Sequence, residues 1–230
     1  MADSPIVHWF PGHMAKATRM ITEYIKKVDV VIELLDARIP RSSANPVIID
    51  LIGQKPHIVL LNKVDLADPK ATKEWTEFFT KKGITVLAID SKSGKGNKKL
   101  LSTVERLSKP IIDRWVAKGI RSRSVRTIIL GIPNVGKSTL INSLAGSAAT
   151  RTANKAGHTR GQQWVKIGKN LELLDTPGVL WPKLEDQRAA ARLAMTGAIS
   201  DDVYDLEHVM KQLLNHLLTN TPNILVERYK

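Results

Sequence analysis

Nine consecutive residues have the composition and spacing of a loop that binds phosphate groups. Residues 131–139 read G-I-P-N-V-G-K-S-T and match the pattern G-x-x-x-x-G-K-[ST] without a mismatch. In this pattern backbone N–H groups surround a polyphosphate, the lysine reaches its terminal phosphates, and the next hydroxyl binds Mg²⁺. A glycine-rich turn without a ligand is the alternative. We expect nucleotide contacts, with catalysis by the lysine and metal binding by the serine, from Asn134, Val135, Gly136, Lys137, Ser138 and Thr139.

The tetrapeptide N-K-V-D at residues 62–65 is expected to contact the base of the same nucleotide. A carboxylate at the end of a strand accepts hydrogen bonds from both N1–H and the 2-amino group of guanine, whereas adenine lacks this pair of donors. N-K-x-D is weak evidence alone, but in a chain with a phosphate loop it favours guanine. The residues expected at the base are Asn62, Lys63, Val64 and Asp65.

Residues 90–92, D-S-K, are a degenerate match to the S-A-K segment of guanine-nucleotide proteins, whose backbone N–H contacts the guanine carbonyl. Asp90 stands where that pattern has Ser, and Ser91 would supply the N–H. An ordinary polar turn after a strand explains these residues equally well.

Residues 175–178, D-T-P-G, follow an apolar run and have the chemistry of a nucleotide-sensing loop. Asp175 can hold a Mg²⁺-bound water, and the N–H of Gly178 can contact the γ-phosphate. Because hydrolysis removes that contact, the following loop can change shape with nucleotide state. Taken alone, the four residues would indicate only a turn.

The elements that carry these motifs alternate between apolar, β-branched runs and amphipathic stretches, which predicts an α/β fold with a parallel-rich sheet. A hairpin adds one antiparallel strand, helices cover both faces, and the strand before the phosphate loop lies inside the sheet. The expected strands are residues 28–35, 57–61, 84–89, 126–130, 163–167 and 171–174, and the expected helices are 15–27, 46–53, 69–82, 97–118, 140–145, 184–196 and 206–218.

Three local expectations accompany this pattern. Pro110 is expected to kink or break the long helix, and Gly146 to end the helix after the phosphate loop. Residues 41–45 are polar and predict a loop. Residues 147–162 are polar and contain glycine, so they predict a mobile loop.

Bulk composition limits the class of protein. A length of 230 residues fits one full domain and a small second one. The chain has no Cys, which excludes disulfides and thiolate metal sites and suits a reducing cytoplasm. No apolar run approaches the roughly 20 residues of a membrane span, and residues 1–5 do not resemble a signal peptide. We therefore expect a cytoplasmic protein without a membrane partner.

The charge of the chain is unusual. There are 35 Lys and Arg against 22 Asp and Glu, a net charge of +13, and such an excess favours polyanionic partners, nucleic acid first. Between residues 95 and 126 the only acids are Glu105 and Asp113. A solvated helix face would explain the same pattern. The basic residues of that stretch and of the first helix are Lys95, Lys98, Lys99, Arg106, Lys109, Arg114, Lys118, Arg121, Arg123 and Arg126, and Lys16, Arg19, Lys26 and Lys27.

The order of the motifs differs from that of ordinary GTPases, which run phosphate loop, switch Thr, D-x-x-G, N-K-x-D and S-A-K. Here N-K-V-D and D-S-K come first, as in a circular permutation of the same sheet. With this order the chain resembles the circularly permuted GTPases of bacterial ribosome assembly. The resemblance spans about residues 8–182 and rests on residues 9–14 (W-F-P-G-H-M), 36–40 (D-A-R-I-P), 62–65, 131–139, 157–159 (G-H-T) and 175–182 (D-T-P-G-V-L-W-P).

The resemblance implies a circularly permuted P-loop GTPase fold and a GTP-hydrolysing assembly factor with GTP, GDP, the large ribosomal subunit and its RNA as partners. We expect a GTPase domain at residues 1–182, a helical region at 183–230, and a monomer off the ribosome. Family members carry a helical C-terminal domain likened to RNA-binding modules, and Lys230 is an early end for the family, so a short or truncated form is expected. Two alternatives are a GTP-gated RNA-binding scaffold with incidental turnover and a GTPase acting on transfer RNA or a protein partner.

The resemblance also indicates metal ligands. Its G-x-T pattern implies that Thr159 binds Mg²⁺ in the GTP state, with Asp175 in the outer shell, although Thr150 and Thr152 lie in the same segment. Asn134 stands where potassium-stimulated GTPases carry Asn, which implies a K⁺ beside the phosphates that neutralises developing charge. Support of the loop turn is the alternative role of Asn134.

The catalytic water needs an unusual partner. Small signalling GTPases place Gln directly after the D-x-x-G glycine, but here that residue is Val179. Histidine suits the task because it hydrogen-bonds near neutral pH. Of His8, His13 and His158, we favour His13, in a segment that the resemblance marks as catalytic, and keep His158 as the second choice. Capping of the first helix is the other explanation of His13.

Overall fold

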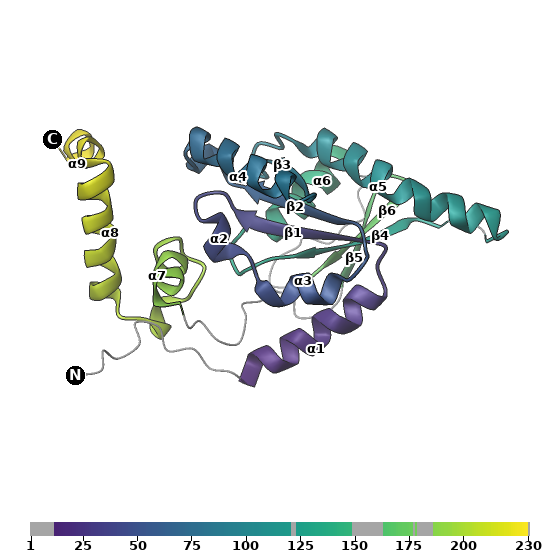
Figure 1. Cartoon of the computed structure of the whole chain (residues 1–230), viewed down its shortest axis with the longest axis horizontal. Helices are drawn as coiled ribbons and strands as arrows, with labels where there is room; N and C mark the ends of the chain where they lie inside the picture. Colours follow the sequence, from purple (N-terminus) through teal and green to yellow (C-terminus); the bar gives the residue numbers. More distant parts are fainter. Residues whose placement is uncertain (1–11, 121–122, 149–162, 177, 179–185, 230) are drawn as a thin grey trace.

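A six-stranded sheet forms the centre of the computed structural model (Figure 1), which describes residues 12–120, 123–148, 163–176, 178 and 186–229. The strands are Val30–Asp36 (β1), His57–Asn62 (β2), Thr85–Ala88 (β3), Val125–Leu130 (β4), Gln163–Ile167 (β5) and Leu171–Asp175 (β6), in the order β3-β2-β1-β4-β6-β5. All neighbours are parallel except the β5–β6 hairpin. This topology confirms the predicted sheet, including the interior position of the strand before the phosphate loop.

The parallel pairing brings the carboxyl ends of four strands to one edge of the sheet. Asp36 at the end of β1 is in register with Asn62 at the end of β2, and β4 and β6 run in the same direction beside them. Ligands of open α/β sheets bind at this edge. The topology therefore collects the motifs that follow these strands, although they are far apart in the sequence.

Helices cover both faces of the sheet because successive strand residues point to opposite sides. Val30 and Ile32 of β1 pack with α5 (Asn97–Ala117) and α6 (Lys137–Ala148) in one apolar cluster. Val31 points to the other face and packs with α1 (Gly12–Lys26) and α3 (Pro46–Ile52). On that face α4 (Pro69–Lys81) covers Leu35.

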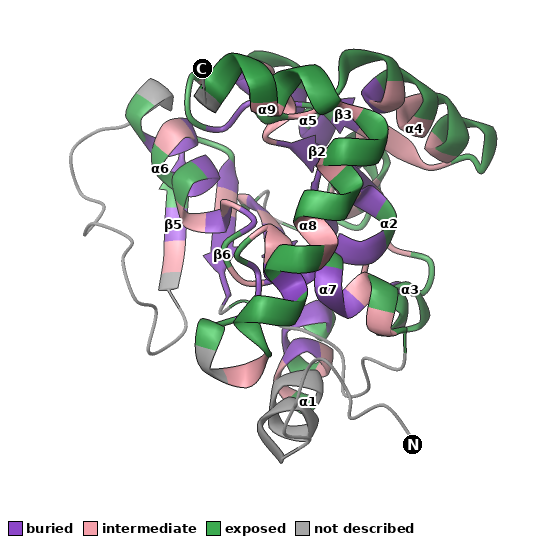
Figure 2. Ribbon diagram, turned by 90° about the vertical axis from the view of Figure 1, so that its left-hand side faces the viewer, coloured by how far each residue is buried: buried purple, intermediate pink, exposed green. Residues whose placement is uncertain are grey.

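Three helices follow the sheet. In α7 (Gln187–Met195), Ala190 and Leu193 belong to the same apolar cluster as β1. α8 (Leu206–Asn220) contacts α7, and α9 (Pro222–Tyr229) contacts α8; both extend away from the sheet in Figure 1 and are largely exposed in Figure 2. No helix in the described ranges is long and apolar enough to cross a membrane. The domain boundary at residue 182 falls outside the described residues and remains a prediction.

Several local features differ from the sequence prediction. α5 runs through Pro110 without a break, since proline removes one backbone hydrogen bond and this side of the helix is open to water. α6 passes Gly146, because glycine costs a helix only about 1 kcal/mol relative to alanine. The stretch expected to be a polar loop, residues 41–45, overlaps α2 (Pro40–Ser43), and no pattern predicted α9. Of the expected mobile loop, residues 147–148 belong to α6 and 149–162 lie outside the described residues.

Candidate nucleotide-binding site

The phosphate loop joins β4 to α6 and needs glycine at two positions. A Cβ on Gly131 would lie 2.6 Å from the carbonyl oxygen of Leu34, and one on Gly136 would lie 2.5 Å from Nδ2 of Asn62. Gly136 also has a φ of 105°, which L residues avoid. The glycine spacing of the motif therefore reflects how closely β1 and the N-K-V-D segment approach the loop.

Lys137 begins α6 and is buried. Its Nζ donates hydrogen bonds to the carbonyl oxygens of Gly131 (3.0 Å) and Ile132 (2.8 Å). Burial lowers the pKa of Lys137 to about 8, while the carboxylate of Asp175 acts in the opposite direction. A polyphosphate in the loop would supply the charge that stabilises the protonated lysine.

Asn62 joins three loops through one buried side chain. Its Nδ2 donates to the carbonyl oxygen of Val135 in the phosphate loop (2.8 Å). Its Oδ1 accepts from the N–H (3.0 Å) and the hydroxyl (2.8 Å) of Ser91. The Ser91 N–H, which the sequence assigns to the guanine carbonyl, is thus engaged by Asn62 in this structure.

Lys63 has a left-handed backbone conformation, with a φ of 63°. Its Nζ donates to the carbonyl oxygen of Asn134 (2.8 Å) and to Oδ2 of Asp36 (3.0 Å). Arg38 contacts the same carboxylate through Nε (2.9 Å) and Nη2 (2.6 Å). Burial alone would raise the pKa of Asp36, but the hydrogen bonds from Arg38 and Lys63 outweigh it and hold the pKa below its usual value.

Asp36 and Arg38 are site residues to which the motifs gave no role. The available signal was an acid at the carboxyl end of a buried strand, followed two residues later by a base. That spacing permits the local ion pair, but nothing in the sequence shows that Lys63 shares the carboxylate.

Asp65 and Asp90, both expected to lie near the guanine base, have different surroundings. Asp65 is exposed in a short 3₁₀ helix, Val64–Leu66. Asp90 instead shapes its own turn, because its Oδ1 accepts from the N–H groups of Lys92 (2.9 Å) and Ser93 (3.3 Å). A hydrogen bond from Ser93 is the main cause that lowers the pKa of Asp90. The carboxylate of Asp65 is accessible to a base, whereas that of Asp90 is committed to its loop.

The D-T-P-G segment begins at the buried end of β6. Asp175 is buried, and the hydroxyl of Thr176 donates to the carbonyl oxygen of Ile129 (2.6 Å). Ser138 lies in the first turn of α6. The Ser138 hydroxyl and the Asp175 carboxylate are hard oxygen donors, which fit Mg²⁺. Within the described residues, no group of three or more His, Cys, Asp or Glu could hold a metal ion.

Gly178 lies against the phosphate loop. A Cβ there would be 2.6 Å from Cα of Pro133 and 3.1 Å from Nζ of Lys137. Glycine is therefore required at this position, and its backbone lies beside the lysine that is expected to contact the γ-phosphate.

Asn134 is exposed at the tip of the phosphate loop, with a φ of 56°. Its Nδ2 donates to the carbonyl oxygen of Gly197 (2.7 Å), and Nη2 of Arg38 donates to that of Thr196 (3.3 Å). These bonds connect the nucleotide loops to the turn that ends α7.

The remaining expected site residues are only partly described. Thr139 is exposed in the first turn of α6. His13 lies in the first turn of α1, but its side chain is outside the description. Residues that lie wholly outside it are Thr159, His8, His158, Thr150 and Thr152, as well as Val179.

Comparison with known proteins gives consistent matches. A family described as "50S ribosome-binding GTPase" matches residues 126–228. Ribosome biogenesis GTPase A of Priestia megaterium is 50% identical over 224 residues, which cover 97% of this chain and 78% of that protein. The Bacillus licheniformis protein of the same name is 52% identical, with 97% and 79% covered. GNP-bound YlqF from T. maritima has a TM-score of 0.64 and 31% identity, covering 89% of this chain and 75% of that one.

Proposed function

Because this chain belongs to the ribosome biogenesis GTPase A family and is a GTPase, we propose that GTP hydrolysis controls its binding to the large ribosomal subunit and its RNA. The observation that carries the proposal is the junction of loops at Asn62 and Lys63, which unites a phosphate loop with a guanine-selective segment. The description of the matching family as 50S ribosome-binding and the net charge of +13 support an RNA-rich partner.

In this proposal, Lys137 and the N–H groups of the phosphate loop bind the β- and γ-phosphates. Ser138 and, in the GTP state, Thr159 bind Mg²⁺, and Asp175 holds one of its water ligands. The ion, when bound, neutralises charge on the phosphate oxygens. Gly178 donates its N–H to the γ-phosphate, an inference supported by its contact with the phosphate loop. Hydrolysis removes that acceptor and releases the following segment.

We also propose that His13 positions the catalytic water, with His158 as the second candidate. Val179 has no polar side-chain atom for the task, and a histidine can hydrogen-bond to water near neutral pH. His13→Ala should bind GTP normally and lose subunit-stimulated hydrolysis. Normal stimulated turnover in that variant would transfer the role to His158 or to a ribosomal group.

Asn134 is the proposed residue beside a K⁺. Its Nδ2 donates to Gly197, so Oδ1 is the side-chain atom that can coordinate a cation. Turnover at equal rates in K⁺ and Na⁺ would exclude this role.

For the RNA, we propose contacts from the basic residues of the 95–126 stretch and of α1. Much of this stretch is α5, whose Lys98, Lys99 and Lys109 are exposed. Phosphate contacts release counterions, so the affinity should fall steeply with salt. We further propose that the protein is monomeric off the ribosome and works in the cytoplasm.

The test is co-sedimentation with purified large ribosomal subunits in a GTP analogue and in GDP, combined with GTP turnover with and without subunits. We expect tighter binding in the analogue state, salt-sensitive association, and faster turnover with subunits. Equal binding in both states together with unstimulated turnover would contradict the proposal and favour a scaffold or a different partner.

A further inference from the structure

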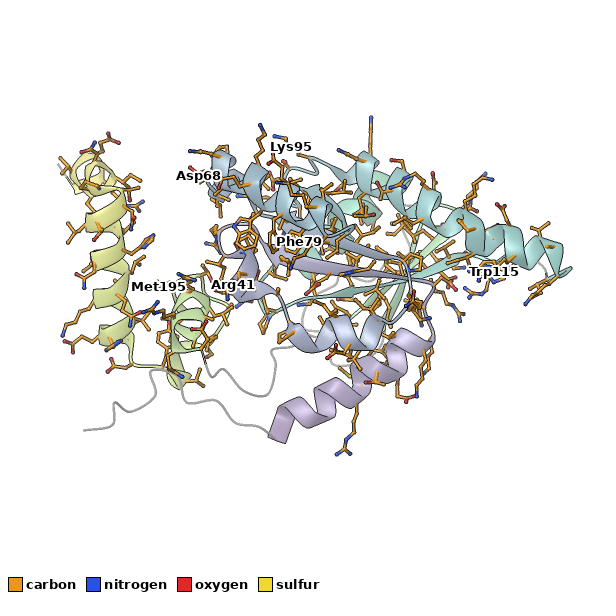
Figure 3. All side chains as sticks on the ribbon, in the orientation of Figure 1. Arg41, Asp68, Phe79, Lys95, Trp115 and Met195 are labelled. Atoms are coloured by element: carbon orange, nitrogen blue, oxygen red, sulfur yellow. The ribbon has the colours of Figure 1, made fainter. Side chains whose placement is uncertain are left out.

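A pocket of about 580 Å³ lies between α2, the start of α3 and α7. It is separate from the nucleotide loops and from the basic residues of α5 and α1. Arg41 comes from α2, and Arg188 and Arg192 come from α7; the lining also includes Asn45, Ile49 and Asp186. Figure 3 shows Arg41 on the side of α2 that faces α7, near Met195. Elements more than a hundred residues apart thus converge on one basic cavity.

Among the described residues, the three guanidinium groups have no protein partner, unlike those of Arg38 and Arg123. Arg38 is bound to Asp36 and Arg123 to Asp29. In contrast, across the described ranges no hydrogen bond or ion pair is formed by the side chains of Arg41, Arg188 or Arg192. All three are exposed. Their donors are therefore available to an external anion.

The backbone elements that present these arginines are well held. Arg188 and Arg192 are four residues apart, so they lie on one face of α7, while Ala190 and Leu193 on its other side are buried in the core. α2 is fixed by Ser43, whose Oγ accepts from the N–H of Asp36 (3.0 Å). Arginines on rigid elements lose less freedom when their planar groups bind phosphate.

One acid lines the pocket, and it already has partners. The carboxylate of Asp186 accepts from the N–H groups of Arg188 (2.9 Å) and Ala189 (3.1 Å), which caps α7. It is not paired with a guanidinium group in the described structure. With three arginines and one acid, the pocket retains a positive charge that favours an anion.

We propose that this pocket binds the phosphate backbone of RNA, with the guanidinium groups of Arg41, Arg188 and Arg192 as donors. The volume is large enough for a nucleotide-sized unit. Ile49, which is 62% exposed at the rim, offers an apolar surface for a sugar or a base. The inference rests on the proposed function, since it identifies a surface by which RNA is bound.

The test compares the full chain with the triple variant Arg41→Gln, Arg188→Gln, Arg192→Gln. The probe is fluorescein-labelled poly(U), whose affinity is measured by fluorescence anisotropy over a range of salt. Each lost phosphate contact lowers the salt slope by about 0.7 for a single strand, so three contacts lower it by about 2. At about 0.1 M salt, this change corresponds to roughly 100-fold weaker binding.

The matched control is Lys70→Gln, Lys73→Gln, Lys81→Gln on α4, which removes the same charge from exposed positions away from the pocket. Unchanged GDP affinity and thermal unfolding check that both variants fold. RNA binding that weakens equally in the two variants would overturn the proposal. So would a pocket variant that keeps RNA binding but loses affinity for fluorescein-labelled polyglutamate, because that result indicates an acidic peptide as the occupant.

Co-sedimentation of the parent with large ribosomal subunits separates this inference from the proposed function. If the parent protein binds subunits and the pocket variant binds poly(U) as well as the α4 control does, only the proposed RNA-binding role of the pocket is refuted. If the parent protein does not bind subunits, the proposed function is contradicted. Selective loss of poly(U) binding in the pocket variant would still support RNA binding by the pocket.

Discussion

The nucleotide loops and the helices α8 and α9 differ in how firmly the rest of the chain holds them. Around Asn62 and Lys63, buried and partly exposed polar groups join segments from four strands through hydrogen bonds of 2.8–3.0 Å. In α8, only Val209 is buried, and an apolar stripe spaced by four residues is exposed: Leu206, Met210, Leu214 and Leu218.

The two regions differ in how far their stability depends on contacts with the rest of the chain. The loops need every partner, because a buried donor or acceptor without one costs about 1–3 kcal/mol. α8 contacts α7 and α9 but buries little, so separating it from the sheet domain should require little free energy. Substitutions should therefore have large effects in the first region and small ones in the second.

The largest expected effect is that of Asp65→Asn. The change replaces one acceptor oxygen by a donor, so one hydrogen bond to guanine is lost and the new NH₂ group faces the 2-amino group of the base. At about 2 kcal/mol for each of these two effects, GTP binding weakens roughly 1,000-fold. Titration with fluorescent GTP and xanthosine triphosphate measures the switch. A variant that still binds GTP as the parent does and excludes xanthine nucleotides would show that Asp65 does not contact the base.

Asn62→Ala should weaken GDP binding by about 100-fold. It removes three hydrogen bonds that join the loops, at about 1 kcal/mol each. Fluorescent GDP titration gives the affinity, and Leu214→Ala in α8 is the control that should match the parent. If both variants bind GDP equally well, the loops do not depend on this junction.

Lys137 should make GDP affinity depend on pH. The pKa is about 8 in the free protein, and bound phosphates keep the lysine protonated. Binding above this pH must therefore take up a proton, and affinity should fall by about tenfold per pH unit. Calorimetry at pH values on both sides of 8 measures the trend, and Lys137→Met should bind weakly without this dependence.

The same lysine affects stability with a defined sign. Its pKa in the folded state is lowered from 10.5 to about 8. Between these two pH values the lysine is therefore protonated in the unfolded chain but not in the folded protein. Charged Lys137 opposes folding at neutral pH, and the penalty is relieved as pH rises from about 8 to about 10.5. Urea unfolding of the nucleotide-free protein should show this gain relative to Lys137→Met. A parallel pH dependence in both proteins would contradict it.

Asn134→Ala tests the connection between the two regions. Loss of the bond to Gly197 (2.7 Å) should cost about 1 kcal/mol, which corresponds to about fivefold faster opening of the turn and the helices beyond it. Hydrogen exchange over residues 186–220 measures this, with α4 as an internal reference. Unchanged exchange would indicate that α7 is held by its core contacts alone.

The smallest effect is expected for Met210→Gln combined with Leu214→Gln. Both side chains are exposed, by 46% and 44%, so the free energy of unfolding should change by less than about 0.5 kcal/mol. Leu193→Ala in α7, with no exposed surface, should cost about 3 kcal/mol. Urea unfolding compares them. Strong destabilisation by the α8 pair would mean that the stripe is covered in solution.

Much of the fold followed from local patterns. The strand, glycine loop and helix around residues 131–139 form where expected, because the motif acts locally. Gly136 takes a positive φ, and Lys137 bonds the carbonyl oxygens of Gly131 and Ile132. Alternating apolar runs predicted every strand of the sheet. Pro110 was expected to kink or break α5 and Gly146 to end α6, but neither helix stops there. One exposed proline removes a single backbone hydrogen bond and one glycine costs about 1 kcal/mol, which the packing of each helix against the core outweighs.

The sequence by itself determined which motifs are present: a phosphate-loop pattern, an N-K-V-D tetrapeptide that predicts guanine selectivity, and an excess of positive charge. It also determined the permuted order of these motifs, and hence the family resemblance. Such features lie in short segments, so their spacing is visible without any fold.

Only the tertiary structure decided which distant residues share a partner. Lys63 meets Asp36, and Asn134 meets Gly197, because parallel strands end at one edge of the sheet and α7 returns to it. Arg41 and Arg188 line one pocket for the same reason. Hydrogen bonds and charges act over a few ångströms in space, and sequence separation carries no information about that distance until the sheet is assembled.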